Sequence, residues 1–228
     1  MKKLFTSIIL LAGILFGYNQ SASAQYYEIA NQIPQLLRPA LTGGLNYKGF
    51  VEAKYLKGIG DNNVDFLGFS TTQGFKYSNW FFMGVGLGVD VAFSHLDPAY
   101  GNWQEPVPSQ YSTNYTTTGV MIPLFTDFRF NIGAPTSAAF FFDVKLGCSF
   151  LVGDNYLKVN KGFLSSQQYF LLRPSMGVRI PVQSQGNNSG KKAFNIGVSY
   201  QLLTSNYWNS YYSNVTLNAL GVDVSFEW

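Results

Sequence analysis

Apolar and polar side chains alternate along residues 81–93, "FFMGVGLGVDVAF". The odd positions from Phe81 to Phe93 are all apolar, whereas the even positions are mostly small and include the carboxylate of Asp90. Side chains of a β-strand point alternately to opposite faces, so this segment predicts a strand with one wholly apolar face. A nucleotide-binding glycine loop fits poorly, because Val89 replaces the third glycine of G-x-G-x-x-G and no helical pattern follows. A membrane helix fits poorly too, because the run is short and contains three glycines.

The same two-residue period recurs eight times after residue 44. It predicts strands near residues 45–57, 63–77, 80–94, 119–132, 139–152, 168–181, 193–204 and 214–228. Soluble strands usually have about 5–6 residues, whereas a tilted membrane strand needs about 9–11. One face is apolar in nearly every segment, and the first two segments are the least regular, with Gly49, Ala53, Thr71 and Gln73 on that face. The pattern predicts an all-β fold.

The connections between these segments favour a membrane barrel over a soluble sandwich. The connections after the second, fourth and sixth segments are brief, and those after the third, fifth and seventh are longer. Outer-membrane barrels have an even number of strands, short periplasmic turns and long outer loops. We therefore predict a transmembrane eight-stranded antiparallel up-and-down β-barrel with periplasmic termini. Its outer loops would be residues 95–118, 153–167 and 204–213.

The start of the chain has the pattern of a secretory signal peptide. Lys2 and Lys3 precede an apolar stretch, and "SASAQ" then places small residues at the expected cleavage point after Ala24. An uncleaved membrane anchor is the alternative. Residues 25–44 contain two prolines, which exclude a long helix. We expect them to form a periplasmic N-terminal segment that packs against the barrel mouth or enters it, with the barrel itself spanning residues 45–228.

Composition supports a lipid-facing protein and excludes several other classes. Charged residues make up 12% of the chain, against roughly 25% on average. Cleavage after Ala24 removes two lysines and no acids, so the formal net charge falls from +3 to +1 and gives no case for nucleic acid. Cys148 and His95 are the single cysteine and histidine, so neither a disulfide within the chain nor a multi-histidine metal site can form, and we expect no cofactor. Cys148 falls on an apolar face, where it is expected to be inert.

The last residues, "LGVDVSFEW", alternate up to a final aromatic side chain. This ending resembles the C-terminal signature that the assembly machinery of bacterial outer-membrane barrels recognises. Together with the signal peptide, it makes the chain most similar to the small OmpA-type and PorT-like barrels of Bacteroidota. The resemblance implies a location in the outer membrane of a Gram-negative bacterium, in contact with lipid and lipopolysaccharide.

Charged side chains gather on the faces opposite the apolar ones. The predicted lumen charge network consists of Lys48, Glu52, Lys54, Asp90, Asp127, Arg129, Asp143, Lys145, Arg173, Arg179 and Asp223, with Lys76 also facing inward. Isolated buried charges cost several kcal/mol each, so these groups must pair or stay hydrated. Since an eight-stranded barrel is just wide enough for its own side chains, we predict an ion-pair plug that closes the lumen. The glycines of residues 84–88 would give long side chains room to lie. A conduction or proton path is the alternative.

Two features bear on activity at the predicted outer surface. The sequence "SHLD" places Ser94, His95 and Asp97 at the end of the third segment, and a histidine can act as a general base. This would suit a lipid-A-modifying barrel enzyme, but neighbours at a strand end point in different directions and no G-x-S-x-G motif is present. Residues 205–214, "SNYWNSYYSN", are rich in aromatics and would form an interfacial girdle or a recognition surface.

We therefore expect a structural or surface-interaction role that depends on the outer loops and involves no catalysis. The alternatives are the lipid-A-modifying enzyme and a barrel subunit of a secretion or uptake complex. A protein partner would bind at the outer loops or at the periplasmic mouth.

Overall fold

A computed structural model gives the arrangement of most of the chain after residue 45. It describes residues 46–78, 80–97, 115–134, 136–153, 156–164, 168–182, 192–205 and 215–228. The chain divides into two units, Met1–Leu45 and Asn46–Trp228. The predicted signal peptide and N-terminal segment lie outside the described residues, as do residues 206–214 of the aromatic stretch.

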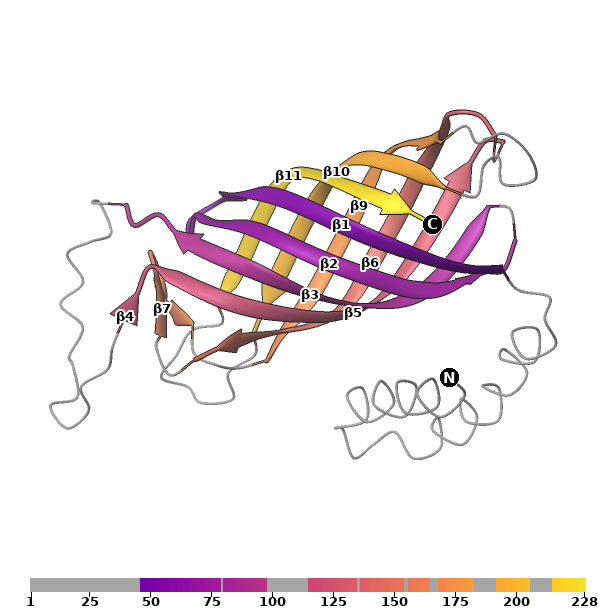
Figure 1. Ribbon diagram of the computed structural model, residues 1–228. Coiled ribbons are helices and arrows are strands. Elements are labelled where there is room, and N and C mark those ends of the chain that lie inside the picture. Colours follow the sequence, from indigo (N-terminus) through magenta and orange to yellow (C-terminus); the bar gives the residue numbers. More distant parts are fainter. Residues whose placement is uncertain are drawn as a thin grey trace, which may run out of the picture. The chain divides into compact units, whose positions relative to one another are not determined.

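Eight long strands form a closed antiparallel barrel (Figure 1). They are β1 (Asn46–Ile59), β2 (Val64–Lys76), β3 (Phe81–Ser94), β5 (Thr118–Ile132), β6 (Ala139–Val152), β9 (Gln168–Pro181), β10 (Ala193–Thr204) and β11 (Thr216–Glu227). Each pairs with its neighbours along the chain, and β1 closes the barrel against β11. The predicted fold is confirmed, and every predicted strand end lies within two residues of the observed one.

The pairing of β1 with β11 explains why a glycine, Gly49, occupies an outward position in the apolar face. The backbone N–H of Gly49 donates to the Trp228 carbonyl at 3.2 Å, and the Trp228 N–H donates to the Gly49 carbonyl at 3.0 Å. The Trp228 indole covers Gly49, because a Cβ added there would lie 2.4 Å from the ring. The outer face is therefore apolar at this point too, with the final tryptophan occupying the space of the missing side chain.

The outward faces of all eight strands carry exposed apolar side chains. Leu67, Val89, Phe140, Val198 and Val222 are examples, and all of them except Leu67 are more than half exposed. These side chains follow the alternation expected of strands with two different faces. Monomeric soluble proteins rarely expose an apolar patch larger than a few hundred Å².

None of the described segments is a helix with the length and apolar character needed to cross a membrane.

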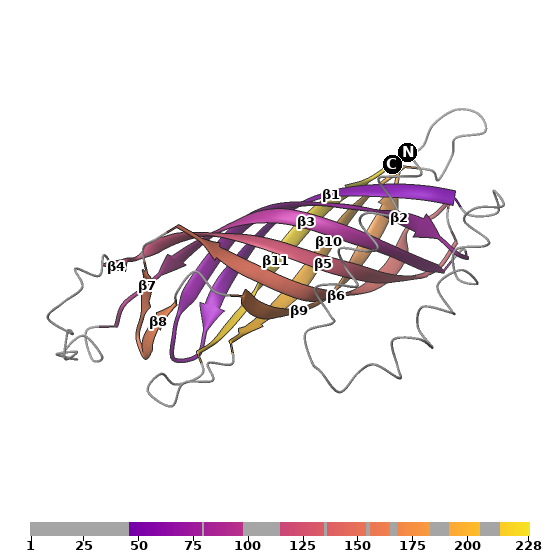
Figure 2. The same ribbon diagram turned by 90° about the horizontal axis from the view of Figure 1, so that it is seen from below.

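A small three-stranded sheet, which we call the cap, lies at one end of the barrel (Figures 1 and 2). It consists of β4 (Tyr115–Thr116), β7 (Tyr156–Val159) and β8 (Gly162–Leu164), with β4 parallel to β7 and β7 antiparallel to β8. We call this end the loop end, and the opposite end, where β1 begins and β11 finishes, the terminal end. The sequence predicted loops at 95–118 and 153–167, so the presence of strands in these connections was missed.

Candidate functional site

The lumen is the candidate functional site, and its charged side chains lie where the alternation predicts. All eleven predicted network residues point inward, and none is more than 8% exposed. Lys76, close to the terminal end, is half-buried. The network divides into a middle charge cluster and a mouth cluster. The middle charge cluster consists of Glu52, Lys54, Asp90, Asp127, Arg129, Asp143, Lys145, Arg173 and Asp223; the mouth cluster consists of Lys48, Arg179 and Glu227.

Ion pairs of the middle charge cluster link four strands, and those of Glu52 cross the lumen. The Lys145 ammonium lies 2.9 Å from Asp143 and 3.0 Å from Glu52. Arg173 donates to Glu52 at 2.6 Å, and Arg129 donates to Asp143 at 2.5 Å. Glu52 belongs to β1, Arg129 to β5, Lys145 and Asp143 to β6, and Arg173 to β9. These pairs therefore tie β1 to β6 and β9 across the interior.

A second part of the middle charge cluster joins β1, β3 and β10. Lys54 donates to Asp90 and to the Gln201 side-chain carbonyl, both at 2.7 Å. Asp223 of β11 accepts a hydrogen bond from the Ser199 hydroxyl. The uncharged partners Gln201 and Ser199 were not among the predicted network residues, although both share the inward parity of their strand.

The mouth cluster occupies the terminal end of the lumen. Glu227 lies 2.7 Å from the Lys48 ammonium and accepts from Arg179 at 2.7 Å and 3.2 Å. Sequence reasoning placed Lys48 and Arg179 inside but missed Glu227. The signal was available, because Glu227 is an even number of positions from the inward Asp223.

Aromatic rings surround the buried guanidinium groups. The centre of the Arg129 guanidinium lies 4.3 Å from the Phe50 ring centroid and 4.8 Å from that of Phe141. The Arg173 guanidinium lies 5.5 Å from the Phe125 centroid. Rings at these distances attract a cation through their negative faces. The inward phenylalanines therefore stabilise the charges as well as filling space.

The glycines of β3 give these rings room. A Cβ added at Gly86 would lie 2.3 Å from the Phe125 ring, and one at Gly84 would lie 2.7 Å from the Phe82 ring. The expected close packing against residues 84–88 is present at both positions.

Replacing Gly86 with valine is expected to lower the free energy of unfolding by about 1–3 kcal/mol, the usual cost of overpacking. The Phe125 ring, 2% exposed, has little free space into which to move. Val85→Ile adds a methyl group on the outer face of the same strand and is expected to change stability little. Urea unfolding of both variants in lipid vesicles would measure the difference, and equal effects would contradict this packing.

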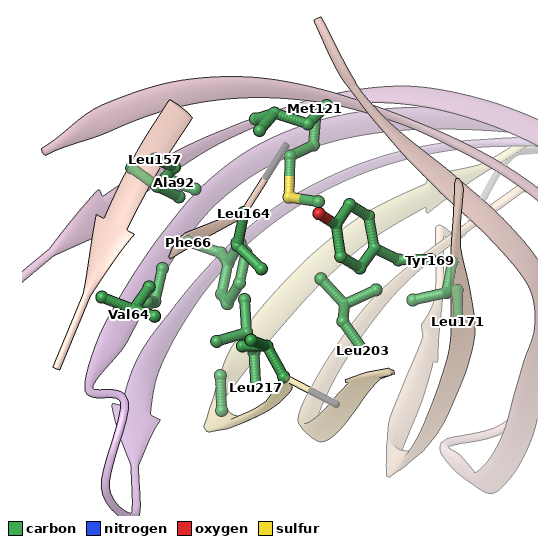
Figure 3. Close-up of a cluster of buried hydrophobic side chains, with 14 of the residues drawn as sticks. Val64, Phe66, Ala92, Met121, Leu157, Leu164, Tyr169, Leu171, Leu203 and Leu217 are labelled. Carbon is green, nitrogen blue, oxygen red and sulfur yellow. The ribbon is translucent and has the colours of Figure 1, made fainter. Parts of the chain in front are cut away.

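The part of the lumen nearer the loop end is apolar. The loop-end cluster consists of Leu56, Val64, Phe66, Ala92, Met121, Phe125, Leu151, Leu157, Val159, Leu164, Tyr169, Leu171, Leu203, Val215, Leu217 and Ala219. All eight barrel strands contribute to it, and Leu157 and Leu164 of the cap point into the same group of side chains as Phe66 and Met121 (Figure 3). Buried ion pairs therefore occupy the part of the lumen nearer the terminal end, whereas the expectation was a lumen packed with charges throughout.

Polar contacts fix the cap to the turn between β1 and β2. The Asn160 side-chain amide donates to the Asp61 carbonyl at 2.8 Å, and the Lys161 N–H donates to the Asn62 side chain at 3.1 Å. Lys161 also forms an ion pair with Asp61, and the Asp97 N–H donates to Asn160 at 2.7 Å. The cap is thus joined to the barrel by buried apolar contacts and by hydrogen bonds at its rim.

The structure does not bring Ser94, His95 and Asp97 together as a catalytic group. His95 Nε2 lies 3.0 Å from Asp65 Oδ2, and the Tyr55 hydroxyl donates to the same carboxylate at 3.0 Å. The Ser94 side chain is buried, and its hydroxyl has no hydrogen-bond partner in the part of the chain that the structure describes. Sequence reasoning missed Asp65, which lies on the neighbouring strand. Among the residues that the structure describes, no three His, Cys, Asp or Glu side chains are placed to hold a metal ion.

Cys148 lies on the outward parity of β6, but its neighbours cover it. It is 6% exposed and is a free thiol.

Comparison with known proteins gives similarity in structure but not in sequence. No protein-family model matches the chain, and no curated protein sequence matches it. The crystal structure of Neisserial surface protein A has a TM-score of 0.49 and 8% identity, covering 79% of this chain and 95% of that one. The outer membrane enzyme PagL has a TM-score of 0.48 and 10% identity, covering 77% and 97%. The N-terminal β-barrel domain of Pseudomonas aeruginosa OprF has a TM-score of 0.39 and 13% identity, covering 81% and 99%.

Proposed function

We propose that this chain is an integral outer-membrane β-barrel with a closed lumen. Its role is structural, or it binds a partner at the bacterial surface through its loop end, and it does not act as an enzyme or a general pore. One observation carries this proposal: an apolar outer face on all eight strands surrounds an interior filled by ion pairs and closed at the loop end by an apolar cluster and a cap.

The outer face supports the membrane location. Burying apolar surface is worth about 25 cal/mol per Å², and half-exposed side chains such as Val89 and Val222 recover that free energy in hydrocarbon. Aromatic side chains gather towards the terminal end, where Trp80 packs against Phe81 and Phe130, with ring centroids 5.6 Å and 5.9 Å apart. Such groups are typical of the girdle at a membrane–water interface.

The sequence supports the finer assignment. A signal peptide cleaved after Ala24 would export the chain, and the alternation that ends at Trp228 suits assembly into the outer membrane of a Gram-negative bacterium. The similarity to OmpA-type and PorT-like barrels of Bacteroidota rests on the same features. Lipid and lipopolysaccharide would then surround the barrel.

The loop end supports a surface-interaction role. Asp61 and Lys161 form an exposed ion pair at the rim of the cap, and Asn160 and Asn62 hold that rim in place through hydrogen bonds. A rim fixed in this way loses little conformational entropy when a partner binds. A barrel subunit of a secretion or uptake complex would use the same end or the periplasmic mouth.

Migration on a gel with and without heating tests the proposed location. We expect the unheated barrel to migrate differently from the boiled chain, to need detergent for solubility, and to protect its strands from protease in vesicles. A chain that stays monomeric and soluble without detergent would contradict the proposal. A detergent pull-down would show whether a stoichiometric protein partner is bound.

A lipid-A-modifying enzyme is the second candidate, and the His95–Asp65 pair favours it, because a carboxylate can orient a histidine that acts as a base. The inward position of Ser94 argues against it. Mass spectrometry of lipid A from wild-type and deletion strains separates the two. An acyl pattern restored by the native gene but not by His95→Ala would establish the enzyme.

A further inference from the structure

Asp127 stands apart from the other carboxylates of the lumen. The residue is 0% exposed, and among the described residues neither of its carboxylate oxygens has a hydrogen-bond partner. Among the described cationic groups only Lys145 comes within ion-pair distance, at 3.9 Å. Asp143, by contrast, accepts from Arg129, Lys145 and Ser175. The two aspartates are therefore equally buried but very differently bonded.

The middle charge cluster around Asp127 contains one more carboxylate than cationic groups. Among the described residues, the middle charge cluster has five carboxylates and four cationic groups. The carboxylates are Glu52, Asp90, Asp127, Asp143 and Asp223, and the cations are Lys54, Arg129, Lys145 and Arg173. Every cation already binds a carboxylate other than Asp127: Lys54 binds Asp90, Arg129 binds Asp143, Arg173 binds Glu52, and Lys145 binds Asp143 and Glu52. Asp223 also has no cation within ion-pair distance among the described residues, but unlike Asp127 it accepts a hydrogen bond, from the Ser199 hydroxyl.

Among the described residues, the strands packed against Asp127 supply no further cation. On β3 its partner in the register is Gly84, which has no side chain, and on β6 its partner is Lys145. Arg129 lies two positions along the same strand and donates to Asp143. Lys145 also contacts Glu52 of β1, which has the same negative charge as an ionised Asp127.

An ionised carboxylate enclosed without a hydrogen bond or a committed cation is strongly unfavourable, and such a group usually becomes neutral instead. We propose that the folded barrel binds one proton at Asp127, so that its side chain is a neutral carboxylic acid in the middle of the lumen. The cluster then has four carboxylates and four cations in charge balance.

The test uses two isosteric variants, Asp127→Asn and Asp143→Asn, in lipid vesicles. At neutral pH the infrared spectrum of the wild-type barrel is expected to contain the C=O stretch of a protonated carboxylic acid, and Asp127→Asn is expected to lack it. Asp127→Asn should unfold at the wild-type temperature or a few degrees above it, whereas Asp143→Asn, which loses acceptors for bound cations, should unfold at a lower temperature or fail to fold.

The proposal also predicts the direction in which the stability of the barrel changes with pH. The folded barrel keeps a proton at Asp127 that the unfolded chain releases above about pH 4. Stability therefore falls as the pH rises, because the native state binds more protons than the unfolded state. The unfolding temperature of the wild type, measured relative to Asp127→Asn, is expected to fall from acid to neutral pH.

Three results would overturn the proposal. The first is a wild-type spectrum without the acid band at neutral pH. The second is a band that persists in Asp127→Asn, which would place the proton elsewhere. The third is a wild-type unfolding temperature that rises with sodium or potassium chloride but not with choline chloride. Asp127→Asn would show no such rise. That result would show that a metal cation, not a proton, balances the charge.

Discussion

Replacing Arg129 with alanine is expected to lower the free energy of unfolding by about 3–5 kcal/mol, the usual cost of breaking a buried ion pair. The Arg129 guanidinium donates to Asp143 at 2.5 Å and packs against the rings of Phe50 and Phe141. Removing it leaves the Asp143 carboxylate with one cation fewer and removes the contacts with both rings. Urea unfolding in lipid vesicles would measure the loss.

Lys161→Ala is the matched control, because it removes the exposed ion pair with Asp61 at the cap rim. Exposed pairs contribute little, so this variant is expected to be close to wild type. Equal losses in Arg129→Ala and Lys161→Ala would contradict a lumen held by buried pairs. Neither variant should give porin-like conductance in a planar bilayer, because the loop-end cluster still fills the lumen.

Replacing Phe66 with alanine is expected to cost about 3–5 kcal/mol, as for other phenylalanine truncations in packed cores. Phe66 is completely buried in the loop-end cluster, where the cap and the barrel meet. The truncation removes apolar burial and leaves a cavity that neighbours such as Leu164 and Leu217 can fill only in part.

Phe69→Ala provides the control on the same strand, because Phe69 points outward and is 62% exposed. Fluid lipid can fill the space that this truncation leaves, so the cavity cost is absent and the loss is expected to be clearly smaller. Chemical denaturation of both variants measures the difference. A Phe69→Ala loss as large as that of Phe66→Ala would mean that the outer face packs against protein.

The barrel itself could be predicted from the sequence because the same alternation of side chains repeats in its strands. Each strand must present one face to apolar surroundings and one to the interior, so a two-residue period fixes both the strand and the direction of its side chains. Along β3, for example, the parity that makes Val89 outward also places Asp90 inward.

The ion-pair partners of the side chains inside the lumen could not be predicted, because they depend on how the barrel closes. Glu52 and Arg173 are 121 positions apart, and no local pattern links them. Parity shows that both point inward, but the contact also depends on the stagger of strands around the barrel. Glu227 is a different case, because its position four residues after the inward Asp223 is enough to place it in the lumen.

The loop end was the hardest part to predict. In β9, Leu171 faces the lumen and Leu172 faces outward, so alternation between apolar and polar residues fails there. The four residues of β7 are too few to establish a period against a connecting loop. His95 pairs with Asp65 across neighbouring strands, and this contact could be found only from the register of β2 against β3.

Thiol accessibility in lipid vesicles tests the central claim most directly, namely that the outer face meets lipid and the lumen is closed. Single cysteines would replace Ser199 inside, Val198 outside and Asp61 at the cap rim, in a Cys148→Ser background. The account predicts that a charged, water-soluble thiol reagent modifies only the Asp61→Cys variant, while a lipid-soluble maleimide also modifies Val198→Cys. Modification of Ser199→Cys by the charged reagent would mean an open lumen, and modification of Val198→Cys by it would mean that the apolar face lies in water.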